Sequence, residues 1–332
     1  MINRWLRVLR TCNLPEGLKM HEADFISKWL VISRACVLSM TLISGLIGGL
    51  LALAQGPVNW WLWIVAVIGI VLAHASNNMI NDYLDYGSGA DTIDDYPRGT
   101  YSPHPIQSGW VTRTRLMTAI LLVNLIDLVI AVYLAIVVGW EILIFAVLGL
   151  LISVFYMAEP VNLKRRGLGE LGVFLVWGPL MIGGVYFTVS RAFPAWIVAA
   201  AVPYGITVTT VLMGKHIDKI GPDTEHEVKT LPVRLGEMKA LFLNQTLFVS
   251  FLVIVALLVL TGTLGPWVLL TLLAIPKLVR ETWPRYSEPK PAEPPENFPI
   301  WPLWYTPWAF RYNRTAGGLF VLGLVLNLII PL

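Results

Sequence analysis

Apolar residues dominate nine runs of this chain, and short polar segments separate the runs. They cover residues 29–54, 60–80, 116–138, 140–157, 168–190, 194–213, 240–262, 264–280 and 315–332. Each run is close to the roughly 20 residues that an α-helix needs to cross the apolar core of a bilayer. The pattern therefore predicts an all-α, polytopic membrane bundle of nine transmembrane helices.

Positive charge is sorted between the two sides of this predicted bundle. Of the 24 Lys and Arg residues, all except Arg191 fall within 1–36, 81–115, 158–166, 215–239 and 277–314, which are every second gap between the runs. Lys and Arg favour cytoplasmic loops. We therefore expect a cytoplasmic N-terminus, a C-terminus outside, and a multi-pass protein of the cell (inner) membrane whose polar motifs face the cytoplasm.

The same pattern gives the domain organisation. Residues 1–28 form a cytoplasmic N-terminal segment, and residues 29–332 form one membrane domain. A stretch rich in Pro and Trp at 281–312 is expected on the cytoplasmic side. Its interpretation is either an irregular interfacial loop or a lid over a lateral opening of the bundle.

Composition narrows the function classes. The chain of 332 residues is 56% hydrophobic and only 14% charged, whereas soluble domains average about 25% charged residues. The net charge of +3 is distributed by topology, so it does not indicate a nucleic-acid partner. Cys12 and Cys36 both fall on the expected cytoplasmic side or in the membrane, so a disulfide is improbable.

The second apolar run leads directly into a cluster of amide and acidic side chains. Asn78, Asp82 and Asp85 recur at a spacing of four and then three residues, so they share one face if the helix continues. Asp91 follows two glycines and can fold back toward them. Clustered carboxylates repel one another unless a cation neutralises them, and oxygen ligands favour Mg²⁺, which also bridges to phosphate oxygens. The alternative interpretation is a solvated acidic loop.

A second cluster follows the sixth apolar run. Asp218 and Asp223 are five residues apart, or about 140° around an ideal helix, so they share a site only if Gly221 and Pro222 break the helix. The cations around them are Lys215, Lys219, Lys229 and Arg234. Acidic and basic groups together suit a polyanion held partly by a metal ion and partly by cations.

These motifs resemble those of the UbiA superfamily of intramembrane prenyltransferases. Asn81-Asp82-Tyr83-Leu84-Asp85 with the later Asp91 is similar to the family's Asn-Asp-x-x-Asp motif. Residues 156–170 are similar to its Tyr-Ser-x-Pro-Pro-x-x-Leu-Lys-x-x-Gly-Leu-Gly-Glu motif, and residues 229–236 to its Lys-Thr-Leu-x-Val-Arg-Leu-Gly motif. Residues 177–180 resemble the branch that prenylates dihydroxynaphthoate in menaquinone synthesis.

The resemblance implies a Mg²⁺-dependent transfer of a prenyl group from an allylic prenyl diphosphate to a lipophilic or aromatic, quinone-precursor-like acceptor. It implies catalytic roles for Asp82, Asp85, Asp218 and Tyr156. The implied metal ligands are Asp82, Asp85, Asp91, Asp218, Asp223 and Asn78, and the implied diphosphate ligands are Asn81, Arg98, Lys164, Arg165 and Lys219. Lys28, Arg34, Arg311 and Arg314 are expected only to orient the bundle.

The chain departs from the family pattern at three places in these motifs, one of which is Glu159-Pro160 in place of the family's Pro-Pro. The second motif usually spaces its aspartates by four residues and has Asn and Arg before them, whereas here the spacing is five, after Lys215, His216 and Ile217. His104 stands where many members have an Arg, so Arg98 could substitute as the phosphate contact.

Two further polar residues within the apolar runs have two interpretations each. Asp127 lies midway through the third run and His74 about two turns before Asp82, and both are candidates for acceptor contact or proton uptake. Hydrogen bonding between helices is the alternative for both. Glu170 is expected to be a structural partner of the basic loop.

Two other function classes stay open. A relative within the superfamily could cyclise its isoprenoid or prenylate a non-quinone acceptor. A secondary transporter could use the acids for a cation and the bases for an anion, although transporters place broken helices at the bilayer midplane and these motifs lie at span ends.

Overall fold

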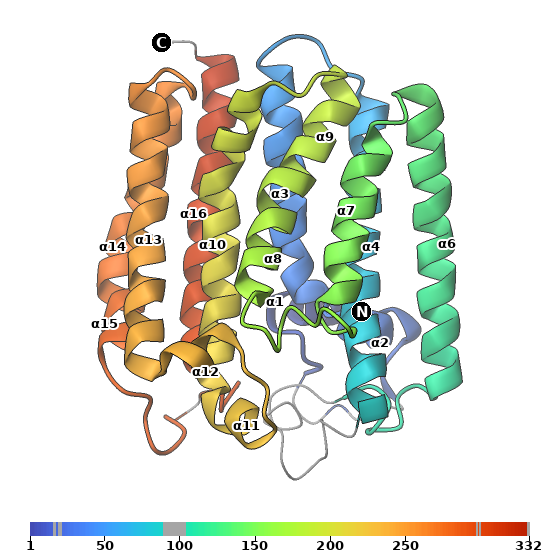
Figure 1. The fold of residues 1–332 in the computed structure, drawn as a ribbon, viewed down its shortest axis with the longest axis vertical. Coiled ribbons are helices and arrows are strands. Elements are labelled where there is room, and N and C mark those ends of the chain that lie inside the picture. Colours follow the sequence, from blue (N-terminus) through green and yellow to red (C-terminus); the bar gives the residue numbers. More distant parts are fainter. Residues whose placement is uncertain (16–17, 19–21, 89–103, 297, 299, 331–332) are drawn as a thin grey trace.

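A computed structural model describes the whole chain except residues 16–17, 19–21, 89–103, 297, 299 and 331–332. In the described part, every regular element is helical, and the long helices lie side by side along the longest axis of the molecule (Figure 1). The N-terminal helices α1 (Ile2–Thr11) and α2 (Phe25–Ile32) lie at the end of the bundle opposite the C-terminus. The predicted all-α membrane bundle is therefore confirmed at the level of fold class.

Seven helices of the described chain are long and apolar enough to cross a membrane. They are Ala35–Leu53 (η2 and α3), Trp60–Leu84 of α4 (Trp60–Ser88), α6 (Arg113–Val137), Gly169–Ser190 (α8, η3 and α9), α10 (Ala195–Asp218), α13 (Glu237–Leu260) and α16 (Tyr305–Ile329). The other two predicted runs are also helical. One is α7 (Ile142–Phe155) with 14 residues, and the other comprises η4 (Pro266–Ala274), α14 (Ile275–Lys277), η5 (Leu278–Thr282) and α15 (Trp283–Ser287).

The first predicted run is not one helix. It divides into α2 and the pair η2 (Ala35–Val37) and α3 (Leu38–Leu53), with Arg34 between them in the left-handed conformation at φ 53°. Asp24 caps α2, because its carboxylate accepts hydrogen bonds from the Ser27 amide at 2.9 Å and the Ser27 hydroxyl at 2.7 Å. The break turns the Arg34 side chain toward α4.

Helix α10 lies in the middle of the bundle. In its apolar 18-residue stretch 78% of the residues are buried, whereas only 11% are buried in the corresponding stretch of α6. It packs against α13, α16, α8 and the π-turn η3 (Val176–Leu180). Gly205 of α10 and Gly178 of η3 face each other so closely that a Cβ built on Gly205 would lie 2.9 Å from the Phe174 carbonyl oxygen. Two glycines thus allow the backbones of the two spans to touch.

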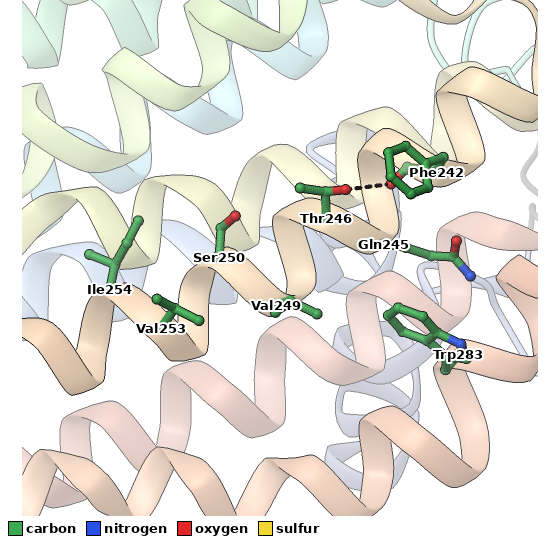
Figure 2. A pocket seen from close by; sticks show the side chains of 8 residues that line it. All are labelled: Phe242, Gln245, Thr246, Val249, Ser250, Val253, Ile254 and Trp283. Carbon is green, nitrogen blue, oxygen red and sulfur yellow. Dashed lines mark hydrogen bonds between the residues drawn. The ribbon is translucent and has the colours of Figure 1, made fainter.

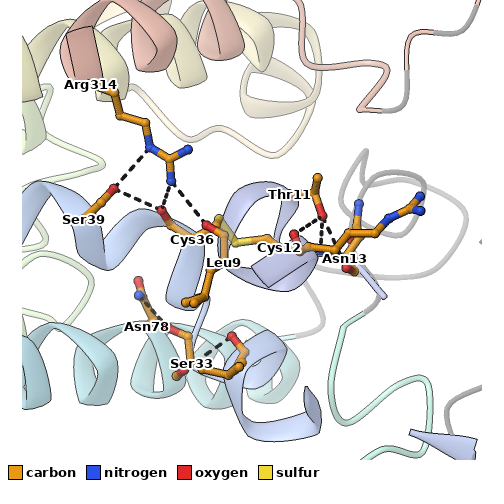
Figure 3. The surroundings of a disulfide bond; sticks show 11 residues. Leu9, Thr11, Cys12, Asn13, Ser33, Cys36, Ser39, Asn78 and Arg314 are labelled. Atoms are coloured by element: carbon orange, nitrogen blue, oxygen red, sulfur yellow. Dashed lines mark hydrogen bonds between the residues drawn. A yellow bond between two sulfur atoms is a disulfide. The ribbon is translucent and has the colours of Figure 1, made fainter. Parts of the chain in front are cut away.

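A disulfide joins Cys12 at the end of α1 to Cys36 in η2, with the Cα atoms 5.2 Å apart (Figure 3). The expectation of unpaired cysteines was therefore wrong. It rested on the cellular compartment alone, whereas the pairing depends on α1 folding back against α2 and η2. Arg314 of α16 reinforces this corner, because its guanidinium donates to the carbonyl oxygens of Cys36 at 2.7 Å and Leu9 at 3.3 Å.

The segment rich in Pro and Trp is shorter as a loop than the sequence suggested, because α15 extends to Ser287 and α16 begins at Tyr305. Cation–aromatic contacts order the residues between these helices. The Arg285 guanidinium lies 5.5 Å from the Trp304 ring, and the Lys290 ammonium lies 4.8 Å from the Trp301 ring and donates to the Pro302 carbonyl oxygen. Burial lowers the pKa of Lys290.

Candidate active site

The first predicted motif lies in the last turns of α4, where Asp82 is completely buried. The guanidinium of Arg34 forms an ion pair with the Asp82 carboxylate. A buried carboxylate is costly unless a cation compensates it. Arg34, which the charge pattern assigned to membrane orientation, is therefore part of this site. Only its position inside the first apolar run, where a charged side chain needs a partner, could have indicated this.

His104 is buried beside the same turn of α4. Its Nδ1 accepts hydrogen bonds from the amides of Ile106 at 3.3 Å and Gln107 at 3.4 Å, so Nε2 carries the proton and donates to the Asp82 carbonyl oxygen at 3.1 Å. In this structure His104 supports the backbone of the first motif.

The other first-motif residues are described to different degrees. The side-chain amide of Asn78 donates to the Ser33 carbonyl oxygen at 3.0 Å, which ties α4 to the break between α2 and η2 (Figure 3). Asn81 is half-buried. Asp85 lies on α4, but its side chain, like all of Asp91 and Arg98, falls outside the described residues.

Tyr156, at the end of α7, belongs to a chain of three polar side chains. Its hydroxyl lies 3.3 Å from Nε2 of His216, and Nδ1 of His216 lies 2.6 Å from a carboxylate oxygen of Glu170. His216 and Glu170 are only 2% and 4% exposed. The sequence noted His216 only as a departure from the family pattern and Glu170 only as a structural partner.

Asp218 is the last residue of α10 and is buried. One carboxylate oxygen accepts hydrogen bonds from the amides of Trp304 at 2.8 Å and Tyr305 at 2.9 Å. The other accepts from the Thr306 amide at 2.9 Å and the Thr306 hydroxyl at 2.6 Å. Asp218 therefore caps the N-terminus of α16 from another helix, which the sequence did not indicate.

The remaining residues of the second motif are also mostly enclosed. Asp223, in α11 (Ile220–Glu225), is completely buried, and Lys219 is 6% exposed. α10 ends before Asp223, so the two predicted acids lie on different helices, but the break is at Lys219, and Gly221 and Pro222 lie inside α11. α12 (Leu231–Leu235) follows at the same end of the bundle (Figure 1).

The basic loop after α7 lies against this second motif. Arg234 of α12 donates to the Arg165 carbonyl oxygen at 3.3 Å and to the Lys229 carbonyl oxygen at 3.0 Å. Lys164 is half-buried, and the Arg165 side chain is exposed. The structure therefore brings the segments of Lys164, Arg165 and Lys219 to one end of the bundle, as the sequence predicted.

The two candidates within the spans differ. Nδ1 of His74 lies 2.7 Å from the Thr41 hydroxyl, which also accepts from Trp177 Nε1 at 3.0 Å, so His74 takes part in hydrogen bonding between helices. Asp127 of α6 has two buried carboxylate oxygens that accept no hydrogen bond from the described chain. One turn away, Asn124 makes the contact between α6 and α4 by donating to the Ser76 hydroxyl at 2.7 Å.

The donor chemistry of the first motif fits a divalent cation. Asp82 is a buried carboxylate whose negative charge requires a cation nearby, and in this structure the guanidinium of Arg34 supplies it. Among the described residues no group of three or more His, Cys, Asp and Glu side chains could hold a metal ion. A magnesium site here would therefore need the carboxylates of Asp85 and Asp91 as well.

A separate groove of about 360 Å³ opens on the surface of α13 (Figure 2). Its lining residues come from α13 except for Trp283 of α15. These residues are Phe242, Gln245, Thr246, Val249, Ser250, Val253, Ile254 and Trp283. None of the predicted site residues lines this groove.

Sequence comparison relates the chain to membrane prenyltransferases. The profile of the UbiA prenyltransferase family matches residues 41–327. The 1,4-dihydroxy-2-naphthoate octaprenyltransferase of Escherichia coli is 29% identical over 263 residues, which cover 76% of this chain and 83% of that protein. The enzyme of the same name from Bacillus subtilis is 23% identical over 269 residues, which cover 81% of this chain and 85% of the relative.

Solved structures show the same fold. A UbiA homologue from Aeropyrum pernix in its apo form superposes with a TM-score of 0.63 at 18% identity, covering 88% of this chain and 98% of that one. A UbiA homologue from Archaeoglobus fulgidus bound to GPP and Mg²⁺ gives a TM-score of 0.58 at 12% identity, covering 88% and 99%. With the buried acidic motif on α4 and the profile match over most of its length, the chain belongs to the UbiA prenyltransferase family.

Proposed function

We propose that this protein transfers a prenyl group from an allylic prenyl diphosphate to an aromatic quinone precursor of the dihydroxynaphthoate type, within the membrane and with Mg²⁺. The observation that carries the proposal is the buried carboxylate of Asp82, paired with Arg34 at the end of a membrane helix. The names of the relatives from Escherichia coli and Bacillus subtilis support this acceptor class. The homologue from Archaeoglobus fulgidus, which binds GPP and Mg²⁺, supports the donor and the metal ion.

The proposed metal ligands come chiefly from the first motif: Asn78, Asp82, Asp85 and Asp91, with Asp223 from the second motif. When bound, Mg²⁺ would supply Lewis-acid stabilisation of the negative charge on the departing diphosphate. Asp218 is assigned a different task, since both of its oxygens already cap α16.

The chain's own cations would hold the remaining diphosphate oxygens. Lys164, Arg165 and Lys219 lie in the segments that meet at this end of the bundle, and Asn81 and Arg98 complete the proposed set. Arg34 joins them because it already compensates Asp82. Fixed cations that need no reorganisation stabilise the charge that develops as the carbon–oxygen bond breaks.

The reaction balances without a redox partner. The allylic carbon–oxygen bond breaks with its electron pair leaving on diphosphate, and the aromatic ring supplies the pair for the new carbon–carbon bond. The attacked ring carbon then loses a proton, or a carboxylate as CO₂, and the electron pair of that bond stays in the ring and restores aromaticity. Excluding water from the bundle protects the allylic cation until the acceptor attacks.

The proposal includes the full topology, with nine spans, a cytoplasmic N-terminus and active site, and a C-terminus outside the inner membrane. The two shorter helical runs at α7 and at η4 to α15 are included as spans. Support comes from α1, α2, α11 and α12, which gather at one end of the bundle while the chain ends at the other (Figure 1). Cytoplasmic placement of that basic end agrees with the sorting of Lys and Arg.

The test is a product analysis with purified protein in detergent or liposomes. The protein is incubated with Mg²⁺, 1,4-dihydroxy-2-naphthoate and geranyl, farnesyl or longer prenyl diphosphates, and the products are identified by mass spectrometry. We expect a prenylated naphthalene product and pyrophosphate. Asp82→Asn should form neither product, whereas Glu225→Gln, which changes an exposed acid of α11, should form both.

Other outcomes would replace the proposal. A cyclised isoprenoid formed without acceptor would point to cyclisation, and a product only with a non-aromatic acceptor would change the substrate class. Failure to release pyrophosphate with every pair of substrates, from folded protein, would refute prenyl transfer.

A further inference from the structure

Tyr156, His216 and Glu170 form a series of hydrogen bonds that joins three helices, and its His216 and Glu170 members are buried. Tyr156 follows α7, Glu170 lies in the first turn of α8 (Gly169–Leu175), and His216 lies in the last turn of α10. The two contacts measure 3.3 Å from the Tyr156 hydroxyl to Nε2 of His216 and 2.6 Å from Nδ1 to Glu170. Residues 46 and 60 positions apart in the sequence meet here.

With an ionised Glu170 and a neutral His216, the chemistry of the three groups gives one direction for these hydrogen bonds. An ionised carboxylate only accepts, so Nδ1 of His216 carries a proton and donates to Glu170. In the neutral imidazole Nε2 is then an acceptor, and the Tyr156 hydroxyl donates to it. A phenol that donates to an imidazole backed by a carboxylate carries more electron density on its oxygen and ring than a phenol in water.

The ring of Tyr156 is also held by packing. Gly169 packs against this ring and leaves no room for a side chain. An added Cβ would lie 3.1 Å from a ring carbon of Tyr156 and 3.6 Å from the His216 ring. The Tyr156 carbonyl oxygen accepts a hydrogen bond from the Lys164 amide at 3.0 Å. Tyr156 is thus fixed at its ring, its hydroxyl and its backbone.

These three hydrogen-bonded residues lie where the basic loop after α7 approaches the end of α10. His216 is two residues before Asp218 on α10, and Tyr156 begins the loop that carries Lys164 and Arg165. Tyr156 and His216 therefore lie on the same segments as Lys164, Arg165 and Lys219, the cations proposed to bind the diphosphate, and their backbones contact Lys164 and Lys219. The positive charge of the reaction arises on the allylic carbon next to that diphosphate.

We infer that Glu170 and His216 are positioning residues that hold and polarise Tyr156, so that its electron-rich phenol stabilises the allylic cation during prenyl transfer. This inference rests on the proposed function. Tyr156 neither gains nor loses a proton: the electron pair of the breaking carbon–oxygen bond leaves on diphosphate, and the acceptor ring supplies the new pair. Tyr156 contributes only electrostatic attraction between its ring and the cation.

The test is a mutant cycle in steady-state kinetics on the full-length protein. Tyr156→Phe keeps the ring and removes the hydroxyl, Glu170→Ala removes the polarising carboxylate, and Glu170→Gln keeps an acceptor for Nδ1. We expect Tyr156→Phe and Glu170→Ala each to lower kcat about fivefold, because the ring remains but loses its polarisation, which is part of a cation–aromatic effect. The KM for prenyl diphosphate should change less than about twofold, and the double variant should be no slower than the slower single one.

Conservative rescue separates this role from a structural one. Glu170→Gln should retain at least about half of the wild-type kcat, because its amide oxygen accepts from His216. Thermal unfolding of each variant checks the fold, and if Glu170→Ala fails to fold, His216→Phe takes its place in the cycle because a phenyl ring accepts no hydrogen bond from Tyr156.

The inference is overturned if Tyr156→Phe keeps the wild-type kcat. It is also overturned if the loss of kcat in the double variant, Tyr156→Phe with Glu170→Ala, equals the product of the two single losses. A rise in KM for prenyl diphosphate with unchanged kcat would also overturn it, since the chain would then act in ground-state binding. Wild-type protein that forms no prenylated product would instead refute the proposed function. The two failures are therefore distinguishable.

Discussion

Removal of the Asp218 carboxylate should destabilise the fold even in the absence of a metal ion. In Asp218→Ala, the amides of Trp304, Tyr305 and Thr306 lose their acceptor, together with the Thr306 hydroxyl. These amides lie at the N-terminus of α16, where no preceding turn supplies carbonyl oxygens. Three backbone donors would be left in a buried place.

The magnitude follows from the number and type of these bonds. An N-terminal cap is worth about 0.5–2 kcal/mol, and a hydrogen bond to a charged group about 1.5–3 kcal/mol net. Relief of the buried charge offsets part of the loss. We expect Asp218→Ala to lower the free energy of unfolding by about 3 kcal/mol.

Asp218→Asn is the matched variant. Its amide oxygen can still accept from Trp304 and Tyr305, but its NH₂ group faces the Thr306 amide, which is also a donor. About half of the loss is therefore expected. The assay is unfolding in detergent, by heat or denaturant, in the absence of Mg²⁺, followed by repetition across a Mg²⁺ titration.

The refuting result is specific. If Asp218→Ala unfolds like the wild type without Mg²⁺ but loses the stabilisation that Mg²⁺ gives the wild type, Asp218 is a metal ligand and the cap is incidental. If it is destabilised without Mg²⁺ and keeps the wild-type response to the ion, the capping role stands. Exposed Glu225→Gln again serves as the control.

Three further predictions concern other parts of the molecule. Cys12→Ser should lower the stability by about 3 kcal/mol, from the loop entropy of a crosslink between positions 24 residues apart; equal Tm values with and without reductant would contradict it. Hydrogen bonds from Ser27 and Trp5 lower the pKa of Asp24. The ionised carboxylate therefore contributes to stability above the ordinary pKa of 3.8, and this contribution is lost as pH falls. Amide exchange in α1 should rise in acid in the wild type but not in Asp24→Asn. Asp127→Leu should raise the Tm and leave kcat unchanged, because the carboxyl oxygens of Asp127 accept no hydrogen bond from the described chain; lost activity would show a catalytic role.

Much of the fold could be predicted because the relevant information is local. The apolar runs, the end of α10 ahead of Gly221 and Pro222, and the basic loops are properties of short segments, and they identified the membrane bundle and the end at which its motifs gather. The first motif was also visible, because Asn78 and Asp82 follow directly from an apolar run. Helix ends were less accurate, as the left-handed Arg34 and the extension of α15 to Ser287 show.

The sequence by itself determined which segments are apolar enough to enter a membrane, which loops carry positive charge, and which acids stand at the ends of α4 and α10. Only the tertiary structure decided what those side chains contact. Arg34 meets Asp82 across 48 positions, His216 meets Glu170 across 46, and Asp218 reaches α16 across 86 to 88. Periodicity and charge reflect the solvent that each segment prefers, whereas a hydrogen bond between distant residues requires that two helices pack in one register.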